Sequence, residues 1–265
     1  DLPPALVACL RCCTAMVPLL LMARKHLGCK IDREDWKYFI LVGCMGYFLT
    51  LFLIQLGISL TGSAMASLLN ALTPVSVTIL AALLLKERIT PIKVLCLVLA
   101  LAGTVVITQG AGSQGEVLGI AVVLLSVVAW GFASVFMRRL TAKYPAVLVT
   151  TYGMAISLLF HIPAGIFSAV TQPVNVSPKV VLTILYLGFF GSGFAQFTWT
   201  KCLSLLPAST CSLFYPLQPA FSALLGAAIL HETFTPAFFF GLLLISADVA
   251  LSTWETQQLS EAAQK

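Results

Sequence analysis

The chain has 265 residues, of which 59% are hydrophobic and only 9% are charged, and its mean hydropathy is +1.00. A soluble domain usually carries about 25% charged residues, so this composition cannot cover a water-exposed surface. It excludes a cytosolic enzyme, a nucleic-acid binder and a disordered protein. The net charge of +5 is explained by the positions of the basic residues in the loops.

A helix that crosses a bilayer needs about 20 mainly apolar residues. In chain order, nine stretches satisfy this requirement, and short connectors separate them. We expect membrane-spanning helices at residues 2–22, 38–58, 63–85, 91–109, 117–137, 146–169, 179–200, 208–230 and 236–254. Cysteines lie mostly inside these stretches, so they are predicted to pack as small apolar residues and to form neither disulfides nor a metal site.

Basic residues are concentrated in alternate connectors, which indicates the orientation of the chain because cytoplasmic loops are enriched in Lys and Arg. One set of connectors holds nearly all of them: Arg24, Lys25, Lys30, Arg33, Lys37, Lys86, Arg88, Lys93, Arg138, Arg139, Lys143, Lys201 and Lys265. The opposite set holds only Lys179. The 23–37 loop and the C-terminus are therefore predicted to be cytosolic, in the cell membrane, and no nucleic-acid partner is needed to explain the basic loops.

The chain also repeats itself at a constant shift of 145 residues. The clearest match aligns LTPVSVTILAALLLKERITP at 72–91 with LQPAFSALLGAAILHETFTP at 217–236. Other pairs at this shift are Pro18 with Pro163, Gly43 with Gly188, Gly46 with Gly191 and Ser59 with Ser204. We therefore expect two repeats, residues 1–109 and 117–254, followed by a cytosolic tail at 255–265.

The shift spans five helices, an odd number, so the two copies must cross the membrane in opposite orientations. Inverted repeats of this kind are typical of secondary transporters, whose substrate site lies near the midplane between the repeats. The span at 117–137 has no counterpart in the first copy. The expected fold is an all-α integral membrane protein, a 5+5 inverted-repeat helical bundle in which the first of ten helices is missing from this sequence.

These motifs resemble the EamA family of the drug/metabolite transporter superfamily. The resemblance rests on the two proline-centred helices that end in an acidic residue, LTPVSVTILAALLLKERIT and LQPAFSALLGAAILHETFT, and on the early span with one arginine, LVACLRCCTAMVPLLL. It implies ten helices and transport of a small metabolite, often export of an amino acid or a drug-like compound. One departure is Asp248, which stands where the first copy has Gly103.

The two proline-centred spans provide the first candidate site. Pro74 and Pro219 cannot donate a hydrogen bond to the carbonyl four residues earlier, so a helix kink is predicted at each proline. In lipid a freed carbonyl needs a partner in the protein or in a wet cavity. Polar residues share a face with these carbonyls, namely Asn70 and Thr73 in the first copy and Tyr215 and Gln218 in the second. A substrate cavity and a packing kink both remain open as interpretations.

Further polar and aromatic residues lie midspan. Tyr47, Thr50 and Gln55 in the first copy and Gln196, Trp199 and Thr200 in the second suit a site that orients a zwitterion or a planar ring, whereas the alternative is interfacial anchoring or helix–helix hydrogen bonding. Trp130, Ser134 and Tyr152 are secondary candidates.

Ionisable residues inside spans are functional candidates by default. Arg11 could bind a substrate carboxylate or pair with backbone carbonyls. Asp248 could carry a coupling proton, or it could snorkel or pair, and His161 could relay a proton or only pack. Glu87 and Glu232 precede Thr-Pro pairs that suit the start of the next helix, which favours a structural hairpin over a gate.

Taken together, these patterns favour a secondary transporter that uses alternating access. A nucleotide-sugar or phosphorylated-metabolite exchanger is the first alternative, although such anions call for more intramembrane cations than Arg11. An intramembrane enzyme and a non-transporting receptor are remote alternatives, because no nucleophile–base motif and no long loop is present. The expected partners are membrane lipid, a small-molecule solute, a proton and a second copy of the chain, with no cofactor.

Overall fold

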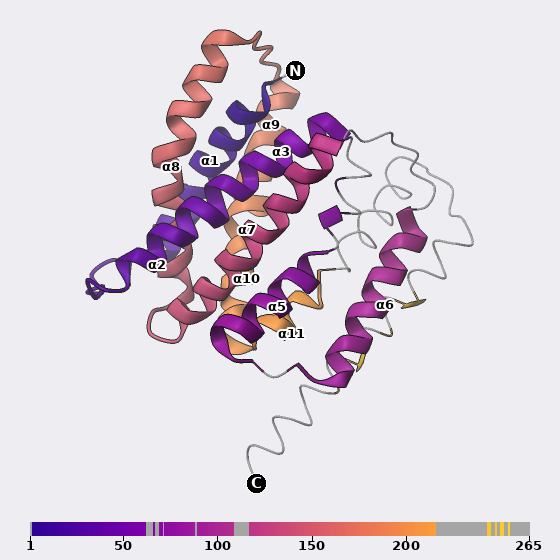
Figure 1. Cartoon of the computed structure of the whole chain (residues 1–265). Coiled ribbons are helices and arrows are strands. Elements are labelled where there is room, and N and C mark those ends of the chain that lie inside the picture. The colour runs from indigo at the N-terminus through magenta and orange to yellow at the C-terminus, as the bar shows by residue number, and fades with distance from the viewer. Residues whose placement is uncertain are drawn as a thin grey trace. The chain divides into compact units, whose positions relative to one another are not determined.

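The computed structural model describes residues 2–61, 66, 69, 70, 72–87, 89–108, 117–215, 243, 244, 247, 250, 251 and 254, and for part of the α6 helix it describes the backbone alone. Within these residues every regular element is a helix (Figure 1). In chain order they are α1 (Pro4–Ala23), α2 (Trp36–Leu41), η1 (Val42–Leu49), α3 (Thr50–Thr61), α5 (Thr73–Leu85), α6 (Pro91–Thr108), α7 (Val117–Thr141), α8 (Ala146–Thr171), α9 (Pro178–Tyr186), η2 (Leu187–Phe194), α10 (Ala195–Leu205) and α11 (Ala208–Ser212).

Five continuous helices are long and apolar enough to cross a membrane: Pro4–Ala23, Trp36–Thr61, Val117–Thr141, Ala146–Thr171 and Pro178–Leu205. They correspond to the predicted spans at 2–22, 38–58, 117–137, 146–169 and 179–200. The predicted span at 91–109 appears as α6, and the described part of the span predicted at 63–85 contains α5, which begins at Thr73. The spans predicted at 208–230 and 236–254 fall largely outside the described residues. The chain is a multi-pass membrane protein.

Proline and hydroxyl residues set where several helices begin. Pro4, Pro91 and Pro178 each occupy the first turn, where a missing N–H costs no hydrogen bond. The hydroxyl of Thr90 accepts a hydrogen bond from the backbone N–H of Lys93 at 3.2 Å, and Ser177 accepts one from Val180 at 3.3 Å. The predicted role of Thr90 at the start of the next helix is thus confirmed.

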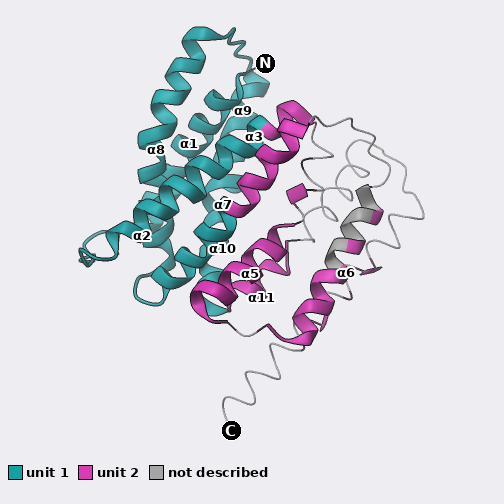
Figure 2. Cartoon of the chain, viewed as in Figure 1, with its two compact units in different colours: residues 1–56, 129–206 teal, residues 57–128, 207–265 magenta. Residues whose placement is uncertain are grey.

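The described part of the chain divides into two compact units, residues 1–56 with 129–206 and residues 57–128 with 207–265 (Figure 2). Each unit takes one segment from each predicted repeat. The first is called unit 1 and the second unit 2 below.

Unit 1 repeats its own architecture. Two π-helices, η1 at Val42–Leu49 and η2 at Leu187–Phe194, are separated by the same 145 residues that relate the sequence repeats. The α1 helix packs on η2, and its counterpart α8 packs on η1. This reciprocal arrangement is that of two copies related by a twofold pseudo-axis.

The helices α1 and α8 are antiparallel and lie side by side in Figure 1. Near one end, a Cβ added at Gly165 would lie 2.7 Å from the Cβ of Cys9, and further along the pair the hydroxyl of Thr151 donates to the carbonyl of Leu19 at 3.4 Å. Residue numbers therefore rise along one helix as they fall along the other. The repeat-related helices run in opposite directions, as the sequence predicted.

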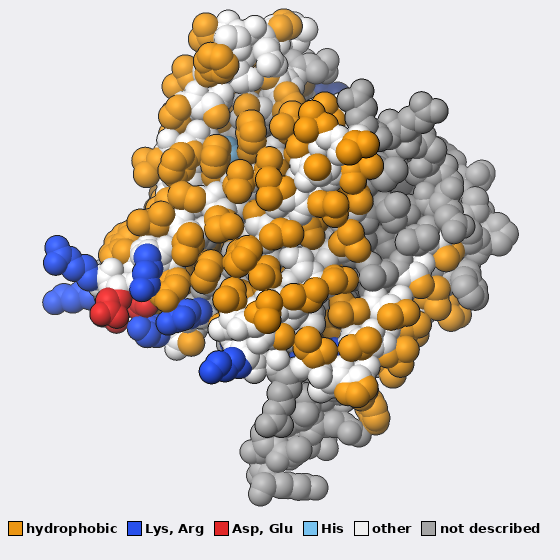
Figure 3. Space-filling view, viewed as in Figure 1, with side chains coloured by type: hydrophobic (Ala, Val, Ile, Leu, Met, Phe, Trp, Pro, Cys, Tyr) orange, Lys and Arg blue, Asp and Glu red, His pale blue; other side chains and the backbone are white. Residues whose placement is uncertain are grey.

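The surface of unit 1 is suited to lipid. Large apolar side chains point outward along the spans, including Leu159, Phe167 and Val170, which are 70%, 71% and 81% exposed. In Figure 3 hydrophobic side chains cover the visible face, and charged side chains gather at the end where α2 begins.

At that charged end, two loops of unit 1 are joined. Lys143 donates to the Asp35 carboxylate at 2.8 Å, and the hydroxyl of Tyr144 donates to the same oxygen at 2.9 Å. The Tyr144 oxygen in turn accepts from the backbone N–H of Asp32 at 3.0 Å. These bonds tie the loop after α1 to the loop before α8.

Candidate functional site

A buried group of polar and aromatic side chains lies inside unit 1, around Tyr47 in the middle of η1. The Tyr47 side chain is fully buried, its ring lies 6.4 Å from the ring of Trp130, and its hydroxyl lies 3.5 Å from that of Thr200. The Tyr47 hydroxyl also contacts the sulfur of Met137 at 3.9 Å. Helices α7 and α10 thus meet η1 at this point, and we call the group the Tyr47 cluster. Its members are Tyr47, Trp130, Ser134, Met137, His161, Gln196, Trp199 and Thr200.

Two indole rings form one wall of the cluster. Trp130 of α7 and Trp199 of α10 have ring centroids 6.2 Å apart and planes inclined by 33°. Ser134 follows Trp130 by one turn of α7, and Gln196 precedes Thr200 by one turn of α10, where the Thr200 hydroxyl donates to the Gln196 carbonyl at 2.9 Å. The arrangement combines flat apolar surfaces with neutral hydrogen-bonding groups.

Several polar atoms of the cluster are buried and have no hydrogen-bond partner among the described residues. They are Trp130 Nε1, Ser134 Oγ, His161 Nδ1 and Gln196 Oε1. A buried donor or acceptor without a partner costs about 1–3 kcal/mol, and in a membrane interior water cannot compensate for it at the lipid face. The packed state seen in the structure therefore leaves hydrogen-bonding capacity unused at the predicted residues Trp130, Ser134, His161 and Gln196.

His161 on α8 connects the cluster to the backbone of η1. Its Nε2 lies 3.0 Å from the carbonyl oxygen of Tyr47, and its ring meets Phe48 edge-on at 4.9 Å. Because a carbonyl only accepts, Nε2 carries the hydrogen, which leaves Nδ1 as an acceptor in the neutral ring.

Arg11 on α1 makes the equivalent contact with η2. Its Nε donates to the hydroxyl of Ser192 at 3.2 Å. Ser192 is the counterpart of Tyr47 at the shift of 145 residues, so each π-helix binds a basic residue of the other copy at the same position. The sequence interpretation did not select Ser192, although its alignment with Tyr47 could have revealed it.

Other predicted residues of unit 1 lie apart from this group or bond locally. Tyr152 stacks edge-on with Trp36 at 5.8 Å and Phe39 at 6.0 Å, which places it with the aromatic residues of α2. The Thr50 hydroxyl donates to the carbonyl of Met45 at 2.8 Å within its own helix. Gln55 is half-buried on α3.

The first proline site lies in unit 2 and differs in form from the predicted kink. Pro74 occupies the first turn of α5, which begins at Thr73, and Leu72 lies in a turn before it. The hydroxyl of the buried Thr73 donates to the carbonyl of Asn70 at 2.6 Å. The carbonyl that Pro74 frees is thus satisfied inside the protein, and the proline starts a helix instead of bending one.

The second proline site falls mostly outside the described residues, which include Tyr215 but not Gln218, Pro219, Glu232 or Asp248. Tyr215 is half-buried, and its backbone N–H donates to the carbonyl of Ser212 at 3.0 Å.

Glu87 anchors the start of α11 within unit 2. Its two carboxylate oxygens accept from the backbone N–H groups of Ala208 and Ser209 at 2.9 and 3.1 Å, and from the Ser209 hydroxyl at 2.6 Å. The buried Lys93 donates to the same Ser209 hydroxyl at 2.8 Å. These are the contacts of a structural anchor, and Lys93, which sequence analysis placed among the loop cations, takes part in it.

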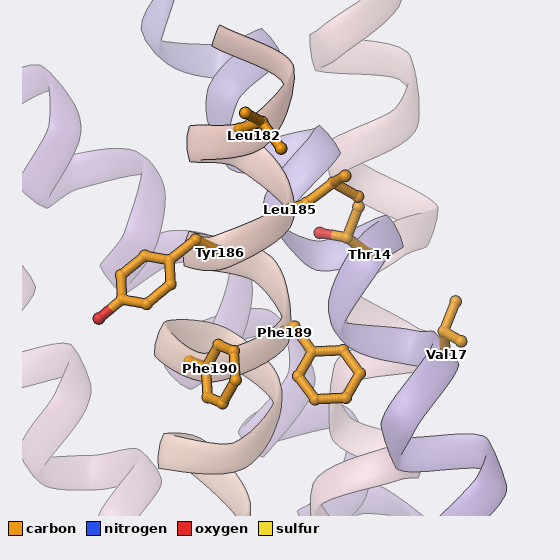
Figure 4. Close-up of a pocket in the computed structure, with 7 residues that line it drawn as sticks. All are labelled: Thr14, Val17, Leu182, Leu185, Tyr186, Phe189 and Phe190. Atoms are coloured by element: carbon orange, nitrogen blue, oxygen red, sulfur yellow. The ribbon is translucent and has the colours of Figure 1, made fainter. Parts of the chain in front are cut away.

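An apolar groove of about 530 Å³ lies on unit 1 between α1 and the α9–η2 segment (Figure 4). Thr14 and Val17 line it from α1, and the other side is lined by Leu182, Leu185, Tyr186, Phe189 and Phe190. Nearly all of its surface is hydrocarbon, so it offers too few hydrogen bonds to orient a polar solute, and the Tyr47 cluster is the better candidate site.

Comparison with known proteins agrees with the fold and its repeat. The model of the EamA-like transporter family matches residues 1–109 and 117–254. An uncharacterized transporter of Archaeoglobus fulgidus is 31% identical over 79% of this chain and 74% of its own length. The uncharacterized transporter YvbV of Bacillus subtilis is 22% identical over 98% of this chain and 86% of its own.

Among solved structures, a protein of 24% identity has a TM-score of 0.80 and covers 96% of this chain and 89% of that one, which shows that the fold is shared. The resemblance indicated by the two proline-centred motifs is thereby confirmed: the chain belongs to the EamA-like transporter family.

Proposed function

We propose that this membrane transporter moves a small metabolite, an amino acid or a drug-like solute, out of the cell by alternating access between its two inverted repeats. It would lie in the cell membrane with its C-terminus in the cytosol, as the basic loops indicate. The solute would bind at the Tyr47 cluster.

One observation carries this proposal: the unused hydrogen-bonding atoms buried in the cluster, Trp130 Nε1, Ser134 Oγ and Gln196 Oε1. If these polar side chains served only packing, apolar residues could replace them without loss of stability. In a solute site, in contrast, such groups serve as the hydrogen-bonding partners of the bound solute.

The cluster also has the composition of a solute site. Ligand sites are usually lined by apolar and aromatic side chains with a few placed polar groups. The indoles of Trp130 and Trp199 offer flat surfaces, and the polar groups beside them offer both donors and acceptors.

The test is transport by the purified protein in proteoliposomes, with uptake and efflux measured across a panel of amino acids under a pH gradient. In Ser134→Ala the unpartnered hydroxyl is removed, so we expect thermal stability to rise by about 1 kcal/mol and flux to fall at least tenfold. An increase in stability together with a loss of flux separates a solute contact from a packing role.

Ser157→Ala is the matched control, because Ser157 is equally buried but its hydroxyl already donates to the carbonyl of Met154 at 2.7 Å. This variant is expected to lose stability and to keep its flux. Unchanged flux in Ser134→Ala, Trp130→Phe and Gln196→Leu would exclude the Tyr47 cluster as the solute site.

A further inference from the structure

Two basic residues lie at nearly the same depth inside unit 1, on the antiparallel helices α1 and α8. Arg11 follows Cys9 by two residues, and His161 precedes Gly165 by four, while Cys9 and Gly165 are in contact. With a rise of 1.5 Å per residue, Arg11 and His161 differ by about 3 Å in their positions along the two helices.

Each of these residues bonds to one π-helix, and the two π-helix residues that they contact are aligned at the shift of 145 residues. Arg11 donates to Ser192 of η2, and His161 bonds to the carbonyl of Tyr47 of η1. Such π-helical segments occur frequently at functional sites. The pair is thus attached to both copies of the repeat.

The structure offers no negative charge to balance this pair within the residues it describes. There the ion pairs join Lys143 to Asp32 and Asp35 in the loops, and Arg11 has the neutral Ser192 as its partner. A cation at membrane depth is costly unless a counter-charge accompanies it. The His161 side chain is fully buried, and its Nδ1 has no partner among the described residues.

We propose that Arg11 and His161 bind the carboxylate of the transported solute, and that His161 takes up one proton together with it. This inference rests on the proposed transport function and specifies its substrate class as a carboxylate. The guanidinium of Arg11 supplies the fixed positive charge and N–H donors with the geometry that carboxylates match.

The tautomer of His161 explains why a proton must accompany the solute. With Nε2–H donating to Tyr47, the neutral ring presents the lone pair of Nδ1, which repels a carboxylate oxygen. A proton taken from water on the entry side binds Nδ1 and converts it into a donor. The carboxylate is then held by two charged donors, the guanidinium of Arg11 and the imidazolium of His161.

The ionisable groups on the elements that pack against α8 are otherwise thiols, phenols and two lysines. They are Cys9, Cys12 and Cys13 of α1, Cys44 and Tyr47 of η1, Lys37 and Tyr38 of α2, and Lys201 and Cys202 of α10. Among them, no carboxylate competes with the solute for Arg11.

The experiment compares each amino acid with its amide in proteoliposomes that contain a pH-sensitive dye. The amide keeps the size and the side chain but has no carboxylate. We expect at least one amino acid to move with one proton per molecule, and its amide to move at least tenfold more slowly.

Variants then locate the site. Arg11→Gln should raise the apparent KM for the carboxylate at least tenfold, whereas Arg11→Lys should restore part of the flux. The amide of Gln in His161→Gln can still donate to the Tyr47 carbonyl, so this variant should fold and elute from size-exclusion chromatography as a single species. It should carry solute without moving protons. The controls Arg24→Gln and His26→Gln change exposed loop residues and should match the wild type.

The outcomes are distinguishable. Equal flux of acids and amides, or full activity of Arg11→Gln, overturns the carboxylate site but leaves the transporter proposal in place. Carboxylate flux without proton movement overturns the role of His161. Absence of flux for every solute contradicts the proposed function itself.

Discussion

Individual residues of unit 1 take part in three polar arrangements: the Tyr47 cluster, the Arg11–Ser192 contact, which the proposed carboxylate site joins to His161 of that cluster, and the loop network around Asp35. The last is the one best suited to a direct test of stability. The hydrogen bond from Lys143 lowers the pKa of Asp35 below its ordinary value of 3.8, and the bond to Asp35 raises the pKa of Lys143 above 10.5.

Asp35→Asn should therefore destabilise the protein by about 1–3 kcal/mol at neutral pH, because the charged acceptor of Lys143 and Tyr144 is lost. The Asp35 contribution is present above pH 3.8 and is lost as the pH falls through the lowered folded-state pKa. The contribution of Lys143 to stability is lost only as the pH rises through its raised folded-state pKa. The melting temperatures of wild type and variant, measured in detergent, should differ from pH 5 to 9 and converge below pH 3.8.

Asp32→Asn is the control at the same loop. Its carboxylate lies 3.8 Å from Lys143 and its side chain is 71% exposed, so its loss should cost less than about 0.5 kcal/mol. Equal effects of the two substitutions would show that the loop charge as a whole, and not the bonded Asp35, stabilises this end.

At the scale of elements, the close approach of α8 to η1 and of α1 to η2 depends on glycine at equivalent positions. A Cβ added at Gly43 would lie 2.7 Å from the Cβ of Ile156 and 2.9 Å from the carbonyl oxygen of Gly153. At Gly188 it would clash with Thr14 and lie 3.0 Å from the carbonyl oxygen of Arg11. Small residues allow membrane helices to pack this closely.

Gly43→Ala and Gly188→Ala are each expected to destabilise the protein by about 1–3 kcal/mol, since backbone atoms of the facing helix cannot move aside as a flexible side chain can. Thermal unfolding in detergent measures the effect. Gly28→Ala is the control, because a Cβ there would meet no atom within 4 Å. A stable Gly188→Ala variant would contradict the packing of α1 on η2.

At the scale of the whole molecule, the inverted repeat predicts that the two ends of the α1–α8 pair face opposite sides of the membrane. Cys29 is exposed in the loop after α1, and Asn175 is exposed in the loop after α8. The loop bonded through Asp35 and Lys143 lies at one end of this pair, and residues 172–177 follow the other end.

We expect a membrane-impermeant maleimide to label Cys29 in inside-out vesicles but not in intact cells, because the basic loop is predicted to be cytosolic. A cysteine introduced by Asn175→Cys in a Cys29→Ser background should label in intact cells instead. Labelling of both positions from one side would contradict the inverted orientation.

Sequence alone was sufficient to locate the five long spans that the structure describes and the repeat that relates them. The thickness of the bilayer requires long apolar helices, so composition alone located the segments that became α1, α7 and α8. The shift of 145 residues also anticipated that η1 and η2 are counterparts in the two repeats. It did not predict that both are π-helices, because no propensity in VGCMGYFL or LGFFGSGF marks that geometry.

Only the tertiary structure decided which polar side chains find partners. Sequence patterns made Tyr47 and Thr73 candidates and Tyr152 a secondary one, but packing placed Tyr47 among polar groups, Tyr152 against Trp36, and Thr73 on the carbonyl of Asn70. A hydrogen bond between distant helices depends on which faces meet and at what depth. The 145-residue spacing could mark Ser192 as the counterpart of Tyr47, but only the packing of α1 on η2 shows that its partner is Arg11.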